Sequence, residues 1–292
     1  MNNNKNQDKW AQWMLQKRFG GDIELQKTGL AFLAEVRDKV LQNAKIEEGN
    51  AVLDVGTGDG LIAFGALDRV GKQGQVIFSD ISQDLLDHCR SLVEDSTIIN
   101  RCRFLRASAD NLAGCDDASV DVVATRSVLI FVEAKQAAFR EFYRVLKPGG
   151  RLSIFEPINR FGDNSPSVFW GYNVAPIIQI MGKIRAIYGQ IQPANDPMVD
   201  FDERDLFNMA ENAGFSEVHL ELKTDKTLTP KVKWETFLRI APNPHIPSLE
   251  EVMKQALTGE EIQKVTDYLR PRVETGQGTR KLAVAYLWAQ KV

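Results

Sequence analysis

The feature that most constrains the fold of this chain is an apolar run that ends in closely spaced glycines. Val52–Val55 is typical of a buried strand, and Gly56, Gly58 and Gly60 follow it directly. Glycines in such a turn let a ligand lie against bare main chain at the start of the next helix, where N–H groups point outward. Leu61 stands where a dinucleotide-binding GxGxxG motif would need its third glycine. The segment therefore predicts a strand, a ligand-binding GxGxG turn and a helix.

Strand and helix patterns alternate through most of the chain. Seven strands are expected, at 51–55, 75–79, 102–106, 120–125, 151–155, 217–222 and 281–289. Among the first five, helical patterns follow the first, second and fourth strands. This repeated order predicts a parallel, doubly wound sheet with its ligand at the carboxyl ends of the strands. The expected fold class is α/β, with a Rossmann-like, seven-stranded and mostly parallel sheet whose last strand is antiparallel.

The overall composition limits the partners of the chain. Its net charge is −3, and no dense Lys/Arg block is present, which disfavours a nucleic-acid partner. The apolar runs are far too short to span a membrane, and the polar N-terminus lacks a signal-peptide core. Cys89, Cys102 and Cys115 show no CxxC spacing and are expected to be free thiols rather than metal ligands. These features predict a cytoplasmic protein without a metal, a nucleic-acid partner or a membrane partner.

Further motifs follow the glycine turn in a fixed order. Asp80 ends the second expected strand, 24 residues after Gly56. The later motifs are RASADNL at 106–112, DASVDVV at 117–123 and LKPGGRL at 146–152. Together they resemble the S-adenosylmethionine (SAM) binding region of class I SAM-dependent methyltransferases of the small-molecule type (methyltransferase domain 11/25-like). The resemblance covers about 46–155.

The resemblance implies that SAM is the cofactor and suggests how it is held. Asp54 would order the glycine turn, and the Asp80 carboxylate would accept hydrogen bonds from both ribose hydroxyls. The adenine would face the loop after the third strand, and the residue after the fourth strand would contact SAM through main chain. The cofactor-binding residues implied in this way are Asp54, Gly56, Thr57, Gly58, Asp80, Ile81, Ala109, Asp110 and Arg126.

Each of these roles has an ordinary alternative. Asp54 could only satisfy loop amides, and Asp80 could only cap the next helix. Asp110 could be a solvated loop acid, and the Arg126 side chain could form a surface ion pair. The adenine loop also departs from the family pattern, because Ser108 replaces its usual first acid. The adenine contact can therefore shift to Asp110 or to main chain.

Composition changes along the chain predict four regions. Residues 1–45 are expected to form a helical lid, with one helix over 9–19, and 46–156 the SAM-binding core. Residues 157–200 would be a proline-punctuated insertion on the acceptor side, with helix across 168–188 that is broken near Pro176. Residues 201–292 would complete the sheet around a helical insertion at about 225–280.

In methyl transfer from a sulfonium, the main contribution of an enzyme is to align the reactants and to exclude water. A general base is required only if the acceptor must lose a proton. Two residues are candidates for such a base. Glu156 ends the fifth strand on the expected acceptor side, and His245 lies in a proline-framed loop of the second insertion.

The acceptor is expected to be a small molecule, methylated on O, N or C. Aromatic residues in the lid and insertions favour an apolar or aromatic acceptor, although such residues usually pack a core or the interface of a homodimer. A cytosine-C5 methyltransferase would need a Pro-Cys nucleophile, and no cysteine here follows a proline. The alternative from another functional class is a SAM-binding protein without catalysis, acting as a regulator or scaffold.

Overall fold

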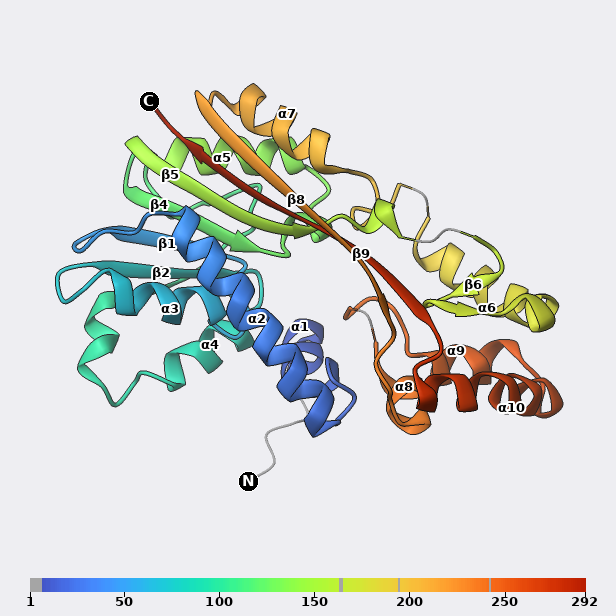
Figure 1. Cartoon of the computed structure of the whole chain (residues 1–292). Helices are drawn as coiled ribbons and strands as arrows, with labels where there is room; N and C mark the ends of the chain where they lie inside the picture. Colours follow the sequence, from blue (N-terminus) through green and yellow to red (C-terminus); the bar gives the residue numbers. More distant parts are fainter. Residues whose placement is uncertain (1–6, 163–164, 194, 242) are drawn as a thin grey trace.

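The core of the protein is built on a seven-stranded sheet, and the remaining helices lie to one side of it (Figure 1). The computed structural model describes residues 7–162, 165–193, 195–241 and 243–292. The strand order is β3-β2-β1-β4-β5-β9-β8. The strands are β1 (Ala51–Val55), β2 (Gln75–Asp80), β3 (Cys102–Arg106), β4 (Val120–Arg126), β5 (Leu146–Pro157), β8 (Glu217–Leu228) and β9 (Thr279–Gln290). The first five are parallel, and β9 runs antiparallel to both β5 and β8. The predicted α/β, mostly parallel sheet is confirmed.

Helices cover both faces of the sheet. The helices and turns of this core are α2 (Ile23–Asn43), α3 (Leu61–Arg69), α4 (Gln83–Ser91), η2 (Thr97–Arg101), η3 (Leu129–Phe131), α5 (Lys135–Val145), η4 (Asn159–Phe161) and α7 (Glu203–Ala213). One buried apolar cluster joins α2, α3 and α4 to one face. A second cluster joins α5 and α7 to the other face. Burial of these apolar faces holds the carboxyl ends of β1, β2 and β4 along one edge.

The N-terminal lid is not the single helix predicted over 9–19. Residues 9–17 form α1 (Lys9–Gln12) and a π-helical turn, η1 (Trp13–Lys17), and we keep the name lid for the described residues before α2. Helix α2, which the sequence assigned to the lid, packs on the sheet instead. The Asp8 side chain caps α1, and the Arg18 N–H donates to the Trp13 carbonyl five residues earlier, at 2.9 Å. The Trp13 indole N–H donates to the Ala241 carbonyl at 2.9 Å. This contact with a distant segment orients the turn and is invisible to a helical-period analysis. Residues 1–6 of the predicted lid lie outside the described residues.

The helix predicted across 168–188 begins later than expected. Strands β6 (Val168–Phe169) and β7 (Tyr172–Asn173) form a hairpin first, and η5 (Ala175–Ile177) leads into α6 (Ile178–Ile191). Trp170 and Gly171 have φ of 47° and 89°, as a two-residue turn between strands requires. A Cβ on Gly171 would lie 2.5 Å from the Thr279 carbonyl oxygen. Pro176 stands at the helix start, where its missing N–H costs nothing.

Two insertions that are far apart in sequence fold into one second core. The hairpin and α6 pack with α8 (Trp234–Arg239), α9 (Leu249–Ala256) and α10 (Gly259–Thr275). We call the described residues of 165–193 and 229–278 the helical arm. Strand β8 continues to Leu228 and not to Leu222 as predicted, so that paired β8 and β9 connect the sheet with the arm (Figure 1). Phe169, Tyr172 and Met181 of the first insertion are buried in this second core.

If the two insertions share one core, a cavity made in one insertion should lower the stability of the helices in the other. Replacing Met181, which is fully buried in α6, by Ala should cost about 2–5 kcal/mol in this core. We expect hydrogen exchange in α9 and α10 to become faster, while exchange in β1 and β4 stays unchanged. The exposed residue Gln190 on the same helix supplies the control, Gln190→Ala. Unchanged exchange in α9 and α10 would contradict a shared core.

Candidate active site

The glycine turn after β1 is held by a buried carboxylate. Asp54 is 1 % exposed, and its Oδ2 accepts hydrogen bonds from the Thr57 hydroxyl at 2.7 Å and the Ala63 N–H at 3.0 Å. These bonds tie β1 to both the turn and the first turn of α3. Burial raises the pKa of Asp54 to about 7. Asp54 therefore does satisfy loop groups, as the ordinary alternative proposed, and in doing so it shapes the turn.

The glycines in this turn are required by geometry. Gly56 and Gly58 have φ of 66° and 57°, in the left-handed region that favours glycine. A Cβ on Gly56 would lie 2.3 Å from Cγ2 of Val128, and one on Gly58 would lie 3.1 Å from Cε of Met14. Side chains from the segment after β4 and from the lid therefore pack directly against the backbone of the glycine turn.

Asp80 projects from the end of β2 toward this turn. Its Oδ2 accepts the Gly58 N–H and its Oδ1 accepts the Ser82 N–H, both at 2.9 Å. Each oxygen keeps a lone pair that a ribose hydroxyl could use. Burial raises the pKa of this carboxyl. The cap of α4 is Ser82, whose hydroxyl accepts the Leu85 N–H, so helix capping does not account for Asp80.

Ile81 and Thr57 flank this carboxylate differently. The Ile81 side chain is 47 % exposed, although it is apolar and follows a buried strand. Thr57 is buried, and its N–H donates to the Ser79 carbonyl at 2.8 Å, which joins the turn to β2. An exposed apolar side chain beside the ribose position is a suitable surface for a nucleobase.

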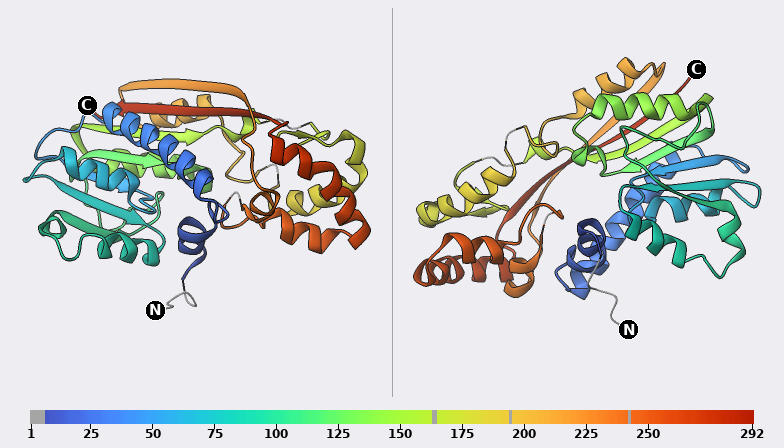
Figure 2. Two further views of the ribbon diagram at one scale, coloured as in Figure 1. Left: turned by 60° about the horizontal axis from the view of Figure 1, so that its bottom comes forward. Right: turned by 180° about the vertical axis from the view of Figure 1, so that it is seen from behind.

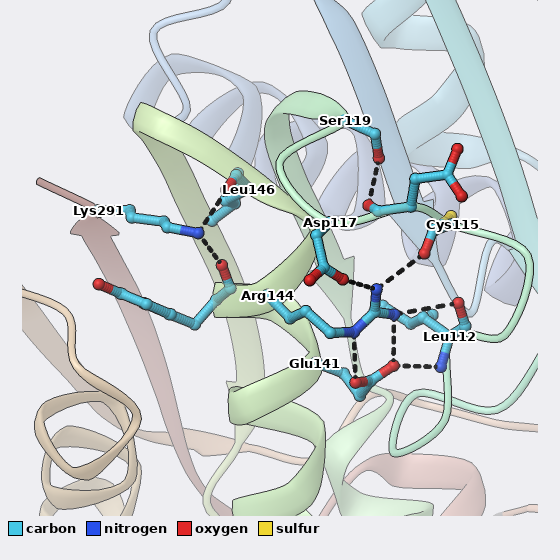
Figure 3. A network of polar contacts seen from close by, with 10 residues as sticks. Leu112, Cys115, Asp117, Ser119, Glu141, Arg144, Leu146 and Lys291 are labelled. Atoms are coloured by element: carbon cyan, nitrogen blue, oxygen red, sulfur yellow. Dashed lines mark hydrogen bonds and ion pairs between the residues drawn. The ribbon is translucent and has the colours of Figure 1, made fainter.

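The loop after β3 is braced by an arginine on α5 (Figure 3). The Arg144 guanidinium pairs with Glu141 and Asp117, each at 2.7 Å, and donates to the carbonyls of Cys115 and Leu112. Glu141 in turn accepts the Leu112 N–H at 2.8 Å, and Arg144 lowers the pKa of Glu141. The network fixes the loop that carries the expected adenine residues.

Those adenine residues lie at the start of the same loop. Ala109 is buried, and Asp110 is half-buried. The Asp110 carboxylate accepts a hydrogen bond from the hydroxyl of Ser108, the residue that replaces the usual acid. Ser108 thereby orients the carboxylate proposed to contact the adenine.

Glu156 lies beneath η3, where backbone N–H groups surround its carboxylate. Its carboxylate is fully buried and accepts three backbone N–H groups, from Val128 at 2.8 Å, Leu129 at 2.9 Å and Ile130 at 3.4 Å. Burial raises its pKa to about 7, and the three hydrogen bonds oppose that rise. These contacts fix η3 at the end of β4. They support a positioning role and give no support to the predicted role as a base.

The lid lies across the carboxyl edge of the sheet. The Ser82 hydroxyl donates to the Asp8 carboxylate at 2.6 Å. The Trp10 ring meets Phe131 edge-on at a centroid distance of 4.8 Å and His245 at 5.4 Å. Both views in Figure 2 place the dark blue N-terminal turns between the core and the orange helices of the arm. The lid therefore connects the end of β2, the end of β4 and the arm.

His245, one of the two predicted candidate bases, lies beside Trp10 of the lid. His245 is exposed, and its ring contacts Trp10 rather than a buried acid. Asp8, Trp10 and Phe131 were not among the expected site residues. An Asp just before an aromatic helical pattern is a helix-start signal that could have identified Asp8. Nothing local to Phe131 indicates its contact with Trp10.

Sequence similarity identifies the family to which this site belongs. The sequence model of the ubiE/COQ5 methyltransferase family matches residues 30–229. The chain belongs to this family. It is a class I SAM-dependent methyltransferase, as the motifs predicted, and SAM is the methyl donor that the family implies. The matched region contains β1 to β5 and the whole glycine turn.

Individual relatives agree with this membership of the ubiE/COQ5 family. The ubiquinone/menaquinone biosynthesis C-methyltransferase UbiE of Idiomarina loihiensis is 31 % identical over 183 residues, which are 61 % of this chain and 71 % of that protein. UbiE of Marinomonas sp. is 34 % identical over 148 residues, 50 % of this chain and 57 % of that protein. The chain thus spans little more than half the length of the second relative.

A solved structure shows the shared fold. It is the phosphoethanolamine N-methyltransferase 2 of Haemonchus contortus in complex with S-adenosyl-L-methionine. The TM-score is 0.53 at 16 % identity, and the match covers 97 % of this chain and 56 % of that one. At this identity the likeness concerns the fold alone.

Two further features bear on partners of this ubiE/COQ5 family member. No helix of the described residues is both long and apolar enough to cross a membrane. Within the same residues, His, Cys, Asp and Glu side chains nowhere gather in a group of three or more that could hold a metal ion.

The ribose role proposed for Asp80 predicts a loss of SAM binding. Asp80→Ala should weaken SAM binding by about 100-fold or more, because a charged acceptor of two hydrogen bonds is removed. Isothermal titration calorimetry measures the affinity. Asp87 on the exposed side of α4 provides the matched control, Asp87→Ala. Equal affinity of wild type and Asp80→Ala would remove the ribose assignment.

The raised pKa of Asp54 predicts a pH-dependent stability. Folded Asp54 keeps its proton up to about pH 7, whereas the unfolded chain releases it near 3.8. The folded state therefore binds more protons between these values, and this contribution to stability is lost as pH rises toward 7. The free energy of unfolding of the SAM-free wild type, relative to Asp54→Asn, should fall from about pH 5 to about pH 7 and then level off. Urea denaturation at each pH tests this, and a difference that rises with pH would contradict it.

Proposed function

We propose that this chain methylates a ring carbon of a small, flat, electron-rich aromatic acceptor such as a quinol, with SAM as donor. The observation that carries the proposal is the aromatic contact of Trp10 with Phe131, which lies in η3 just after the end of β4. The relatives named above are C-methyltransferases of quinone biosynthesis, which supports a ring-carbon acceptor.

The residues of the chain supply positioning. SAM, when bound, supplies an electrophilic methyl group on a sulfonium. The Gly56–Gly58 main chain and the Asp80 carboxylate would hold the donor, and Ile81, Ala109 and Asp110 would border its base. Trp10 and Phe131 would orient a flat ring and exclude water, since aromatic rings prefer such stacked or edge-on contacts. Glu156 acts indirectly by fixing η3, which carries Phe131.

Neither of the two predicted bases, Glu156 and His245, is assigned the role of a base in this proposal. Glu156 accepts three backbone N–H groups, and His245 is exposed and contacts the Trp10 ring. A quinol fits this site because its oxygens activate the ring carbon that is methylated. That carbon must then lose its proton to restore the aromatic ring, and water can accept this proton without a base in the protein.

The methyl acceptor is proposed to be a small molecule and not a nucleic acid, in keeping with the net charge of −3. The family consists of methyltransferases by name, which favours an enzyme over a non-catalytic SAM-binding scaffold. A cytoplasmic location and a homodimer remain predictions from the sequence.

The proposal is tested directly with 1,4-naphthoquinol under reducing conditions. The protein and SAM should yield S-adenosylhomocysteine together with a product methylated on ring carbon, identified by mass spectrometry and NMR. The Asp80→Ala variant is expected to form neither. Methylation on oxygen, or no turnover by wild type that binds SAM, would overturn the ring-carbon acceptor.

The lid aromatic should affect the acceptor more than the donor. Trp10→Ala removes the ring that meets Phe131 and should raise KM for naphthoquinol by about 10-fold, since an aromatic pair contributes roughly 0.5–1.5 kcal/mol beyond area burial. Trp10→Phe is the conservative control and should retain most of the affinity. A KM unchanged in Trp10→Ala would contradict the acceptor position.

A further inference from the structure

Two arginines from distant segments, Arg18 and Arg126, both lie beside the glycine turn. Arg18 follows the π-helical turn of the lid, and its Nη1 donates to the thioether of Met14 at 3.3 Å. The methyl of that Met14 lies over Gly58, so the lid arginine is next to the turn. Arg126 ends β4, directly before Ser127, whose φ of 54° turns the chain away from the strand.

Both guanidinium groups lack a carboxylate partner. In the part of the chain that the structure describes, no Asp or Glu oxygen lies within the ion-pair distance of 4.0 Å from a nitrogen of either guanidinium. The hydrogen bond from Arg126 to the Ser127 hydroxyl is long, at 3.5 Å. Burial and the neighbouring charge of Arg126 lower the pKa of Arg18 to about 10. Two cations are thus held near each other, at a cost that a bound anion would relieve.

The acids around this pair do not neutralise it by direct contact. Asp54 is engaged with Thr57 and Ala63. Glu156 is engaged with the N–H groups of η3. Asp59 lies close enough to attract both arginines, but it forms no ion pair with either of them in the described structure. The guanidinium N–H groups therefore remain available to a ligand.

We propose that Arg18 and Arg126 together form a binding site for a carboxylate. A guanidinium presents paired N–H groups that match a carboxylate in a bidentate geometry, and two such groups suit one anion well. The site would be complete only with the lid in place, because Arg18 belongs to the lid. Carboxylate binding would therefore hold the lid over the glycine turn.

The position of the pair along the sheet indicates two sources for the carboxylate. The proposed adenine loop follows β3 and the ribose acid ends β2, so that an elongated donor would direct its amino-acid end past β1 toward β4. The carboxylate is then either that of the SAM amino-acid end or one carried by the methyl acceptor. This inference rests on the proposed function, since both molecules are ligands of that reaction.

Binding measurements on the full chain distinguish the two sources. Arg18→Gln, Arg126→Gln and the exposed lid control Lys17→Gln are titrated with SAM and with decarboxylated SAM, which lacks only the carboxylate. Salicylate is then titrated into each protein saturated with S-adenosylhomocysteine. Arg126→Lys, which keeps the charge without the forked donors, is measured alongside, and the thermal midpoint of each variant reports folding.

A SAM carboxylate predicts that each Arg→Gln change weakens SAM binding by about 10-fold to 100-fold and leaves decarboxylated SAM unaffected. An acceptor carboxylate predicts unchanged SAM binding but a similar loss of salicylate binding. Lys17→Gln should bind like wild type, and Arg126→Lys should be intermediate. Affinities for SAM and salicylate within twofold of wild type in both Arg→Gln variants would overturn the carboxylate site. Wild type that binds neither SAM nor decarboxylated SAM would instead refute the proposed function.

Discussion

The buried carboxylate of Asp54 is the constraint on which the ligand edge of this fold depends. It joins the last residues of β1 to Thr57 in the turn and to Ala63 in α3. If the turn moved, the buried carboxyl of Asp54 would lose these hydrogen bonds or become exposed to water. A buried polar group without a hydrogen-bond partner costs free energy, so these two hydrogen bonds stabilise the turn. The left-handed glycines then follow, because any side chain on Gly56 would collide with Val128.

The edge is completed by segments that are distant in sequence. Asp80 reaches back to Gly58, η3 is held by Glu156 at the end of β5, and the lid meets both the core and the arm through Trp10 and Trp13. Each connection uses a different interaction, namely a carboxylate on N–H groups, an aromatic edge contact and an indole hydrogen bond. The site is therefore a joint product of the core, the lid and the arm.

The sequence predicted those parts of the fold that are encoded locally. The β1 run, the glycine turn and Asp80 depend on neighbouring residues, and their positions agree with the structure. Strand β5 is different: it was predicted over 151–155 but covers Leu146–Pro157, because Leu146 already pairs with Val120 before an irregularity in the register. The Trp170–Gly171 turn was hidden because tryptophan rarely adopts a positive φ, so that the hairpin resembled a helix start. The core that α6 shares with α9 and α10 depends on contacts between residues more than fifty positions apart in the chain. The periodic pattern of apolar residues shows which face of a helix is buried but does not show which distant helix packs against it. For Glu156, proximity to the acceptor side suggested chemistry, whereas three N–H groups already occupy its oxygens.

The construction of the arm from two separated insertions has a consequence for biosynthesis. As the chain leaves the ribosome, α6 appears well before α9 and α10, with its apolar face still unmatched. Strand β9 is synthesised after the other strands of the sheet, and it must insert between β5 and β8. Late, non-local pairing of this kind is slow. Nascent chains truncated before residue 279 should therefore be the forms that chaperones bind for longest.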